Sequence, residues 1–598
     1  MKRAVHLFKK SINIIKTEGF NAFLLKFKNY ISRRILNENK KYKRYIKENM
    51  IDEKKKELIR KNIQTLSFKP LISIITPVYN IDPKILKKTI DSVINQIYEN
   101  WEMCICDDGS SNKGTVNYLK SIEGVDKRIK IIYSEKNGGI SIASNKALSI
   151  ANAEYVAFLD HDDTIEPNAL YEIVKLLNHH PDADLIYTDE DKINIKEKRF
   201  DPFFKPDFSI DLLLSMNYII HLLIIKKLLI NQIGGFRKEF DGSQDYDLIL
   251  RVVEKTNKIY HIPKVLYHWR TLESSAANSI YSKPYAYERA KKAIEDYLKR
   301  NNISATVKVS IETVHYEIKR EINSKPLISI IIPTKDKVEY LKNCIDSIFN
   351  KSTYKNYEIF IIDNNSVNIE TKKYFKKIEK INNIHILHYP YNFNFSKINN
   401  FAVSKTNGEI LLFLNNDIEI INEDCLERLL EHTLRKEVGV VGAKLLFKNN
   451  TIQHAGVILG LGGIAGHAYY KEDSKAIKYF NIANVIRNYS AVTFVCAMMR
   501  KSVFLEIGAF DENLPYNFND VDFCLKVREK GYLIVYTPFA QLFHFESTSR
   551  IPKVEKNEIE YIYKRWRNII DNDPYYNINL TRNRNDFGLR EKLIPWGL

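Results

Sequence analysis

Two aspartates, Asp160 and Asp162, follow directly on an apolar stretch of the sequence, with His161 between them. Neighbouring carboxylates repel one another unless a cation lies between them. A divalent ion such as Mg²⁺ or Mn²⁺, bridging the carboxylates to a diphosphate, satisfies both groups. The pair therefore indicates a metal site for a phosphorylated ligand, although an Asp-x-Asp on its own is more often a solvated turn.

A second acidic turn, Asp107-Asp108-Gly109-Ser110, also ends an apolar stretch. A carboxylate in that place can accept a hydrogen bond from a nucleotide base or a ribose hydroxyl. In isolation the tetrapeptide is an ordinary turn signal. Its interpretation therefore depends on what else the chain places near it.

Asp245 stands in the first turn of a predicted helix that starts near Tyr246. A carboxylate there can simply stabilise the helix end. It can also act as a general base that removes a proton from an attacking hydroxyl. Downstream, Trp269 offers a flat apolar face to a sugar ring and Arg270 offers a guanidinium to a diphosphate.

The same set of residues recurs later in the chain. Six matches keep their order, at offsets of 255 or 256 residues in the early part and 274 to 276 in the late part. Such ordered matches exclude coincidence and predict two similar domains of about 250 residues. The matched pairs are Pro70–Pro77 with Pro326–Pro333, Asp107–Ser110 with Asp363–Ser366, Phe158–Asp162 with Phe413–Asp417, Gly234–Phe236 with Gly508–Phe510, Asp245–Asp247 with Asp520–Asp522, and His268 with His544.

Short apolar runs alternate with helical segments in each copy. Strands that are apolar throughout are typical of a parallel sheet covered on both faces, and the alternation predicts an α/β, doubly wound sheet. In such sheets ligands bind at the carboxyl ends of the strands, which is where the acidic turns fall. In the first copy we expect strands at 72–76, 103–106, 129–133 and 155–159, and helices at 83–96 and 168–178.

Taken together, these motifs resemble glycosyltransferase family 2, whose domains have the GT-A fold. The resemblance covers about residues 69–275 and about residues 325–550. It rests on Pro77-Val78-Tyr79-Asn80, Asp107–Ser110, Asp160-His161-Asp162 and Gln244-Asp245. The second copy resembles the rhamnosyltransferase-like branch through Pro333-Thr334-Lys335, Asn415-Asn416-Asp417 and His544-Phe545-Glu546-Ser547. The whole chain resembles tandem transferases of bacterial surface-polysaccharide loci, in which Asp-Pro-Phe-Phe-Lys-Pro-Asp-Phe (201–208) and Asp-Pro-Tyr-Tyr (573–576) also recur.

The resemblance implies a role for each matching residue. Asp245 and Asp520 would be the catalytic bases of two inverting displacements. The implied metal ligands, for Mn²⁺ or Mg²⁺, are Asp160, Asp162, Asp417 and His544. The implied donor-binding residues are Pro77, Tyr79, Asn80, Asp107, Asp108, Asp160, Trp269 and Arg270 in the first copy, and Pro333, Asp363, Asn394, Asn415 and Asn416 in the second.

The second copy departs from the first at three places. Asn415 replaces Asp160, and an asparagine carbonyl is a weaker ligand for a divalent ion than a carboxylate. The nucleotide-binding turn reads Asp-Asn-Asn-Ser, and Glu546 stands where the sequence match puts Arg270, so that Arg550 is left to meet the diphosphate. The sequence therefore predicts two sites that use different donors.

We expect a basic helical segment at 1–68, transferase domains at 69–315 and 325–550, and a helical extension at 551–598. The expected activity is a bifunctional transfer of sugars from nucleotide-diphosphate donors to a lipid-linked or polysaccharide acceptor. One alternative keeps the first domain catalytic and makes the second a degenerate glycan-binding module. A nucleotidyltransferase is a third interpretation, but the chain lacks the glycine-rich phosphate loop expected near its first strand.

Composition limits the partners and the location. The net charge is +18, but residues 1–68 hold 19 Lys/Arg against six Asp/Glu, so the excess is a basic head and nucleic acid is not an expected partner. Residues 1–36 mix lysines with apolar side chains, and this segment either caps the protein or lies on an anionic membrane. No apolar run reaches the ~18 residues of a membrane span. No signal peptide or CxxC pair is evident, so we expect a cytoplasmic protein, with peripheral contact to the inner membrane face left open.

Overall fold

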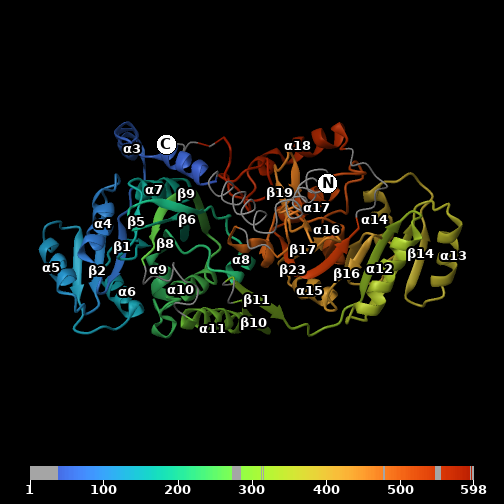
Figure 1. Ribbon diagram of the computed structural model, residues 1–598, viewed down its shortest axis with the longest axis horizontal. Helices are drawn as coiled ribbons and strands as arrows, with labels where there is room; N and C mark the ends of the chain where they lie inside the picture. Colours follow the sequence, from blue (N-terminus) through green and yellow to red (C-terminus); the bar gives the residue numbers. More distant parts are fainter. Residues whose placement is uncertain are drawn as a thin grey trace, which may run out of the picture.

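The computed structural model describes residues 38–272, 284–310, 313, 315–475, 479–545, 554–592 and 594. The proposed membrane-contacting segment 1–36, and also Glu546 and Arg550, lie outside these residues. Two α/β halves lie side by side, the first blue to green and the second yellow to red (Figure 1). Among the described helices, none is long and apolar enough to cross a membrane.

The first half is built on a mixed sheet of order β3-β2-β1-β4-β8-β6-β9-β5, with β7 beside β6. Strands β1 to β4 pair in parallel and so do β6 and β9, whereas β8 runs antiparallel to both of its neighbours. The predicted, mostly parallel α/β sheet is therefore confirmed, with antiparallel insertions. The strands are β1 Ile72–Val78, β2 Trp101–Asp107, β3 Ile129–Tyr133, β4 Tyr155–Phe158, β5 Thr164–Ile165, β6 Leu185–Ile193, β7 Arg199–Phe203, β8 Leu223–Lys226 and β9 Ile259–Arg270.

The second half repeats this topology in the order β14-β13-β12-β15-β22-β17-β23-β16. Its parallel and antiparallel pairs fall at the same places as in the first sheet. The predicted tandem organisation is therefore confirmed. The strands are β12 Ile328–Thr334, β13 Tyr357–Asp363, β14 Ile384–His388, β15 Ile410–Leu414, β16 Ile418–Ile420, β17 Val438–Leu446, β18 Ile452–His454, β19 Val457–Leu459, β20 Ala465–His467, β21 Arg487–Asn488, β22 Cys496–Arg500 and β23 Leu533–His544, with the hairpin β10 Ala305–Ser310 and β11 His315–Arg320 between the halves.

Helices connect the strands and cover the sheets. In α4, Asp82 caps the helix and Pro83 begins it, while Leu86, Ile90 and Val93 form the buried stripe expected of an amphipathic helix. Residues 38–49 are helical. The α-helices that follow are α3 Glu53–Thr65, α4 Pro83–Ile94, α5 Lys113–Ile122, α6 Ile140–Ser149, α7 Ala169–His179, α8 Ile210–Ser215, α9 Lys227–Gln232, α10 Gln244–Val253, α11 Pro284–Arg300, α12 Val338–Lys351, α13 Ile369–Ile378, α14 Phe395–Val403, α15 Cys425–Thr433, α16 Lys501–Glu506, α17 Asn519–Glu529 and α18 Lys556–Asp571.

A common register aligns the two halves residue by residue. The backbone N–H of Ile165 donates to the Ser92 hydroxyl (3.4 Å), and that of Ile420 donates to the Ser347 hydroxyl (3.2 Å). These residues therefore occupy the same place in the two halves, 255 positions apart. The offset carries through β5 and β16, so each position there has a defined counterpart.

This register corrects one sequence match. His268 pairs with Thr164 across the first sheet, whereas the residue that pairs with the counterpart of Thr164 is Phe543. His544 therefore takes the place of Trp269. The predicted match of His268 with His544 is wrong by one residue. The match relied on the shared residue type, whereas the pairing of the strands sets the true register.

The two halves meet through a buried polar interface. The two recurrent stretches singled out in the sequence, 201–208 and 573–576, contact one another there: the N–H of Asp207 donates to the carbonyl of Pro574 (2.7 Å). After α18 the chain runs back to the first half (Figure 1). There the Asn577 side chain donates to Asp189 (2.9 Å). Buried polar groups are costly unless they are paired. This interface therefore holds the halves in a defined relative orientation.

A charged contact across the interface joins Asp211 of α8 to Arg435, 2.5 Å apart. Asp211 is 3% exposed, and the pairing with Arg435 overcomes burial to hold the pKa of its carboxyl at about 2. We expect Arg435→Met to leave this carboxylate buried without its partner and to lower the free energy of unfolding by about 3–5 kcal/mol. Urea denaturation measures the change. The exposed pair of Lys87 with Asp91 supplies the control, because Lys87→Met should change stability by less than ~0.5 kcal/mol; equal effects of the two substitutions would contradict the prediction.

Candidate active sites

The two aspartates of the acidic turn after β2 make different contacts. Asp108 accepts hydrogen bonds from the backbone N–H groups of Gly138 (3.0 Å) and Gly139 (2.8 Å), and so fixes the loop before α6. Asp107 is 3% exposed, and its Oδ1 atom has no hydrogen-bond partner among the described residues. A buried acceptor without a donor is costly. The arrangement suits a ligand, such as a nucleotide base, that donates to Asp107.

Asn80 joins the first strand's loop to the same turn. Its Oδ1 accepts from the backbone N–H groups of Ser111 (2.8 Å) and Asn112 (2.9 Å). The side chain of Asn80 therefore fixes the turn, and its predicted contact with the sugar donor stays a prediction. Tyr79 is exposed at the same loop, and the carbonyl of Pro77 lies 3.0 Å from His161 Nδ1.

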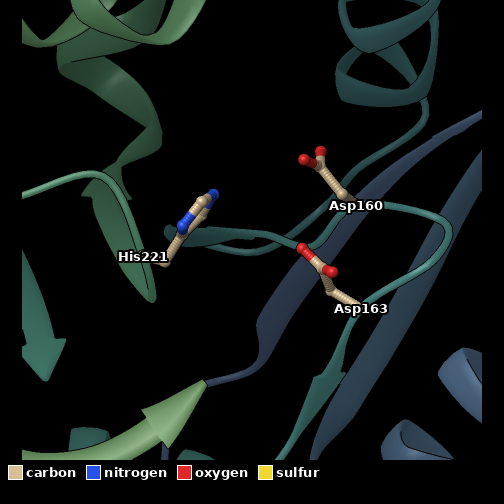
Figure 2. Close-up of side chains that lie close together, drawn as sticks. All are labelled: Asp160, Asp163 and His221. Atoms are coloured by element: carbon tan, nitrogen blue, oxygen red, sulfur yellow. The ribbon is translucent and has the colours of Figure 1, made fainter. Parts of the chain in front are cut away.

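Beyond β4, three side chains gather where the sequence predicted a pair. Asp160, Asp163 and His221 place their ligand atoms within 4.8 Å of one another, the two acids on the loop after β4 and the histidine just before β8 (Figure 2). Asp160 was predicted as a ligand, whereas Asp163 and His221 were not. The predicted partner Asp162 is not in this group. The adjacent third aspartate was visible in the sequence, but nothing in the sequence pointed to His221, which is 58 positions away.

The electrostatics of this acid–histidine group (Asp160, Asp163 and His221) favour a bound cation. Burial, together with Asp162 and Asp160, raises the pKa of the Asp163 carboxyl well above its usual range. Its oxygens accept from the Tyr267 hydroxyl (2.5 Å) and from the N–H of Arg270 (2.6 Å). Neighbouring buried carboxylates are stabilised by a positive ion between them. Two carboxylates and an imidazole are also ligand types that suit Mn²⁺, so these residues fit the implied metal.

The carboxylate of Glu190 contacts the imidazole of His221. Glu190 lies 3.3 Å from His221 Nδ1 and is itself paired with Lys205 (2.9 Å), while the His221 ring stacks on Tyr267 with centroids 4.4 Å apart. A carboxylate that contacts one nitrogen of a ligating histidine orients the ring and makes the other nitrogen a better ligand. The histidine is thus held in place from two sides.

The side chain of Arg270 is buried within the protein. It is 1% exposed, and its guanidinium contacts Glu197 (2.5 Å) and the Asp162 carbonyl (2.6 Å). Groups of the protein itself thus occupy the guanidinium, and its predicted contact with a diphosphate stays a prediction. By the register its counterpart is Phe545 rather than Glu546. Trp269 lies beside His221, with ring centroids 5.7 Å apart.

Asp245 completes the first site. It stands in the first turn of α10 and lines a cavity of about 70 Å³ together with Pro77, Asp160 and His221. Burial raises the pKa of the Asp245 carboxyl to about 6, and its Oδ2 accepts from the Asn217 side chain (3.2 Å). The structure thus brings a carboxyl with a raised pKa and the acid–histidine group to one cavity at the carboxyl ends of the strands.

The second half holds a larger cavity, of about 720 Å³. The predicted residues that line it are Pro333, Asn415, Asn416, Asp417 and Asp520. The sequence analysis assigned no site role to other lining residues, which include Lys335, Lys337, His467 and Tyr516. Burial raises the pKa of the Asp520 carboxyl, as it does that of Asp245.

The two residues predicted to bind metal in the second half are in contact. His544 Nε2 lies 3.1 Å from Asp417 Oδ1, and its Nδ1 lies 2.5 Å from Gln453. An imidazole and a carboxylate held together in this way fit a divalent ion, with Gln453 orienting the ring. His467 lines the same cavity, and burial lowers its pKa to about 4, so it is a neutral imidazole at physiological pH.

The ligand set of the first half has no counterpart in the second. Leu223 and Ala497 pair with equivalent phenylalanines of β4 and β15, so Val495 stands where the first half has His221. By the same register Asn415 replaces Asp160 and Ile418 replaces Asp163. Conversely, the place of His544 is taken by Trp269. The two sites therefore differ at every one of these positions.

The residues predicted to bind the nucleotide donor also differ between the halves. Asp363 accepts from the N–H of Ser366 (2.9 Å) and lies 3.2 Å from His388 Nδ1, which leaves it better satisfied than Asp107. Asn394 caps α14 by accepting from the N–H of Lys397 (3.0 Å), and it does not line the cavity. Its predicted contact with the sugar donor stays a prediction. The neighbours of Asn394, Phe393 and Phe395, line the cavity instead.

Comparison with known proteins finds one family in both halves. Residues 73–231 and 329–508 each match the family model described as glycosyl transferase family 2. Over 546 residues the chain is 41% identical to the uncharacterized protein y4gI of Sinorhizobium fredii, covering 89% of this chain and 60% of that protein. Over 535 residues it is 35% identical to the O-antigen biosynthesis protein RfbC of Myxococcus xanthus, covering 88% of this chain and 42% of that protein. The crystal structure of S. aureus TarS 1–349 in complex with UDP-GlcNAc is 19% identical, covers 38% of this chain and 66% of that chain, and has a TM-score of 0.32.

Proposed function

The chain belongs to glycosyl transferase family 2 in both halves, and from this premise we propose that it is a bifunctional inverting transferase. Each half would move a sugar from a nucleotide-diphosphate donor to a hydroxyl of a growing glycan. The two mixed sheets are consistent with the GT-A fold. The observation that carries the proposal is the repeated pairing of a carboxyl of raised pKa, Asp245 or Asp520, with a cavity at the carboxyl ends of the strands.

In the proposed reaction of the first half, Asp245 takes the proton of the acceptor hydroxyl as its oxygen attacks the anomeric carbon. The bond from that carbon to the diphosphate oxygen breaks, and the nucleoside diphosphate leaves with the bonding electrons. Attack from the face opposite the leaving group inverts the configuration. Asp107 would hold the nucleotide, and Asp160, Asp163 and His221 would hold a divalent ion, which when bound supplies positive charge to the diphosphate.

In the second half Asp520 would serve as the base, and Asp417 with His544 would hold the ion. Lys335 and Lys337 line this cavity and would add positive charge near the diphosphate. Because the nucleotide ends and ligand sets of the halves differ, we propose that each half uses its own donor.

For the acceptor, we propose a cell-surface polysaccharide or a lipid-linked glycan. The similarity to a relative named as an O-antigen biosynthesis protein supports this class, although the chain spans less than half of that relative. Contact of residues 1–36 with an anionic membrane remains part of the proposal, since a lipid-linked acceptor would lie at that surface.

A second candidate function treats the second half as a glycan-binding module without catalysis. Asn415, Ile418 and Val495, which replace the acid–histidine group of the first half, favour it. Purified protein, incubated with a panel of nucleotide sugars with and without Mn²⁺, separates the two candidates. Release of nucleotide from two different donors supports two active sites, whereas release from one donor that depends only on Asp245 supports the binding module.

The pKa of about 6 for Asp245 predicts a pH dependence of transfer by the first half. Only the ionised carboxylate can accept a proton, so activity is present above about pH 6 and falls roughly tenfold per unit below it. We expect this acid limb in kcat/KM for the first donor, measured from about pH 5 to about pH 8. Donor binding measured over the same range is the control. A profile that stays flat down to about pH 5 would contradict the assignment of Asp245 as the base.

A further inference from the structure

Two exposed aromatic rings stand in the wall of the second cavity. Phe393 is 41% exposed and Tyr516 is 42% exposed, and their rings are stacked with centroids 5.9 Å apart and planes 19° from parallel. Both side chains line the cavity that contains Asp520. Aromatic side chains usually bury most of their surface. This aromatic platform (Phe393 and Tyr516) therefore presents apolar surface to whatever enters the cavity.

The platform is held in place from the C-terminal helix. Glu558 of α18 is buried, and its carboxylate accepts from the backbone N–H groups of Tyr516 (2.9 Å) and Asn517 (3.1 Å). It also accepts from the Asn517 side chain (2.6 Å). A buried carboxylate with several hydrogen bonds fixes the segment that it contacts. The ring of Tyr516 is thus carried by an anchored segment, four positions before Asp520.

At the equivalent described positions the first half has no aromatic platform, although its fold is the same. Helices α6 and α14 begin at residues 140 and 395, which puts Gly138 in the place of Phe393. Helices α10 and α17 begin at residues 244 and 519, which puts Asp241 in the place of Tyr516. The fold therefore does not require aromatic residues at these positions, and a role in ligand recognition specific to the second half explains them.

We propose that Phe393 and Tyr516 bind a pyranose ring of the acceptor glycan, an inference that rests on the proposed function of the second half. The C–H face of a pyranose is apolar and its rim is polar, which matches an aromatic surface inside a polar cavity. The proposed binding site of the nucleotide lies at the ends of β12 and β13, around Asp363. Tyr516 lies instead on the segment that leads to Asp520, and the base must reach the acceptor hydroxyl.

A binding experiment tests the platform without turnover. The full chain, saturated with UDP, is titrated with methyl pyranosides of glucose, galactose, N-acetylglucosamine and rhamnose, and saturation-transfer NMR reports the ring protons that touch the protein. We expect Phe393→Leu and Tyr516→Leu to lower the affinity for the sugar about tenfold, and Tyr516→Phe to retain that affinity. Tyr391→Leu is the matched control, because Tyr391 is 65% exposed, two residues from Phe393, and does not line the cavity.

Transfer kinetics distinguish the acceptor from the donor sugar. For the second donor, we expect Phe393→Leu and Tyr516→Leu to raise the acceptor KM about tenfold and to leave the donor KM unchanged. A rise in the donor KM alone would overturn the assignment to the acceptor. So would unchanged sugar binding in both variants, or no binding of any methyl pyranoside to the unmodified chain. Asp520→Asn separates this proposal from the proposed function: loss of transfer with retained sugar binding supports both, whereas retained transfer refutes the base and leaves the binding result to decide the platform.

Discussion

Asp245→Asn should abolish transfer from one nucleotide sugar and leave transfer from the other intact. Asparagine keeps the size and the hydrogen-bonding oxygen of the side chain but cannot accept the proton, so the loss falls on the chemical step. General-base catalysis contributes about 10²–10⁴-fold, and we expect kcat for the first donor to fall by that factor with little change in the donor KM. Asp520→Asn should have the same effect on the second donor.

Each variant is the control for the other, because both carry the same chemical change in the same kind of helix turn. The measurement is release of nucleoside diphosphate and formation of the glycoside, followed for each donor separately. Loss of both transfers from one substitution would indicate that the two reactions are obligately sequential, which single-turnover measurements with a preformed acceptor would resolve. Full activity of Asp245→Asn with both donors would refute the assignment of the first base.

The second large effect concerns the acid–histidine group. Asp160→Asn and His221→Val give the first half the residues that stand at these places in the second half, Asn415 and Val495. Substitution of a residue that only orients a ligand typically lowers metal affinity 10–100-fold, and removal of two ligands should cost at least as much. We expect the double variant to lose transfer from the first donor by at least about 100-fold at fixed Mn²⁺, with the second donor unaffected.

His161→Asn is the matched control for this experiment. It also introduces the residue found at its counterpart, Asn416, but its ring contacts the Pro77 carbonyl rather than the acid group. We expect less than about a tenfold effect from it. Titration of Mn²⁺ into chelator-treated protein measures the ion requirement of each donor. If the double variant and the control lost equal activity, the three residues would not form the metal site.

Much of the fold was predictable because it depends on local pattern. The apolar run 72–76 became part of β1, in which almost every residue is buried, since residues buried on both faces of a sheet leave a continuous apolar signal in the sequence. The 255- and 256-residue repeat determined that there are two copies of one sheet. The acidic turns were correctly placed at strand ends, because parallel strands put their carboxyl ends at one edge.

The composition of each site depended on packing that no local pattern records. His221 reaches Asp160 only because β8 lies antiparallel beside β4. The Arg270 side chain is buried because the Asp162 carbonyl and Glu197 bind its guanidinium. A one-residue difference in register exchanged His268 for Trp269 as the counterpart of His544. The sequence by itself therefore determined two copies of one sheet, the family, and the two carboxyls proposed as bases. Only the tertiary structure decided which side chains surround those carboxyls, because contacts across a sheet join residues far apart in the chain and their register must be observed.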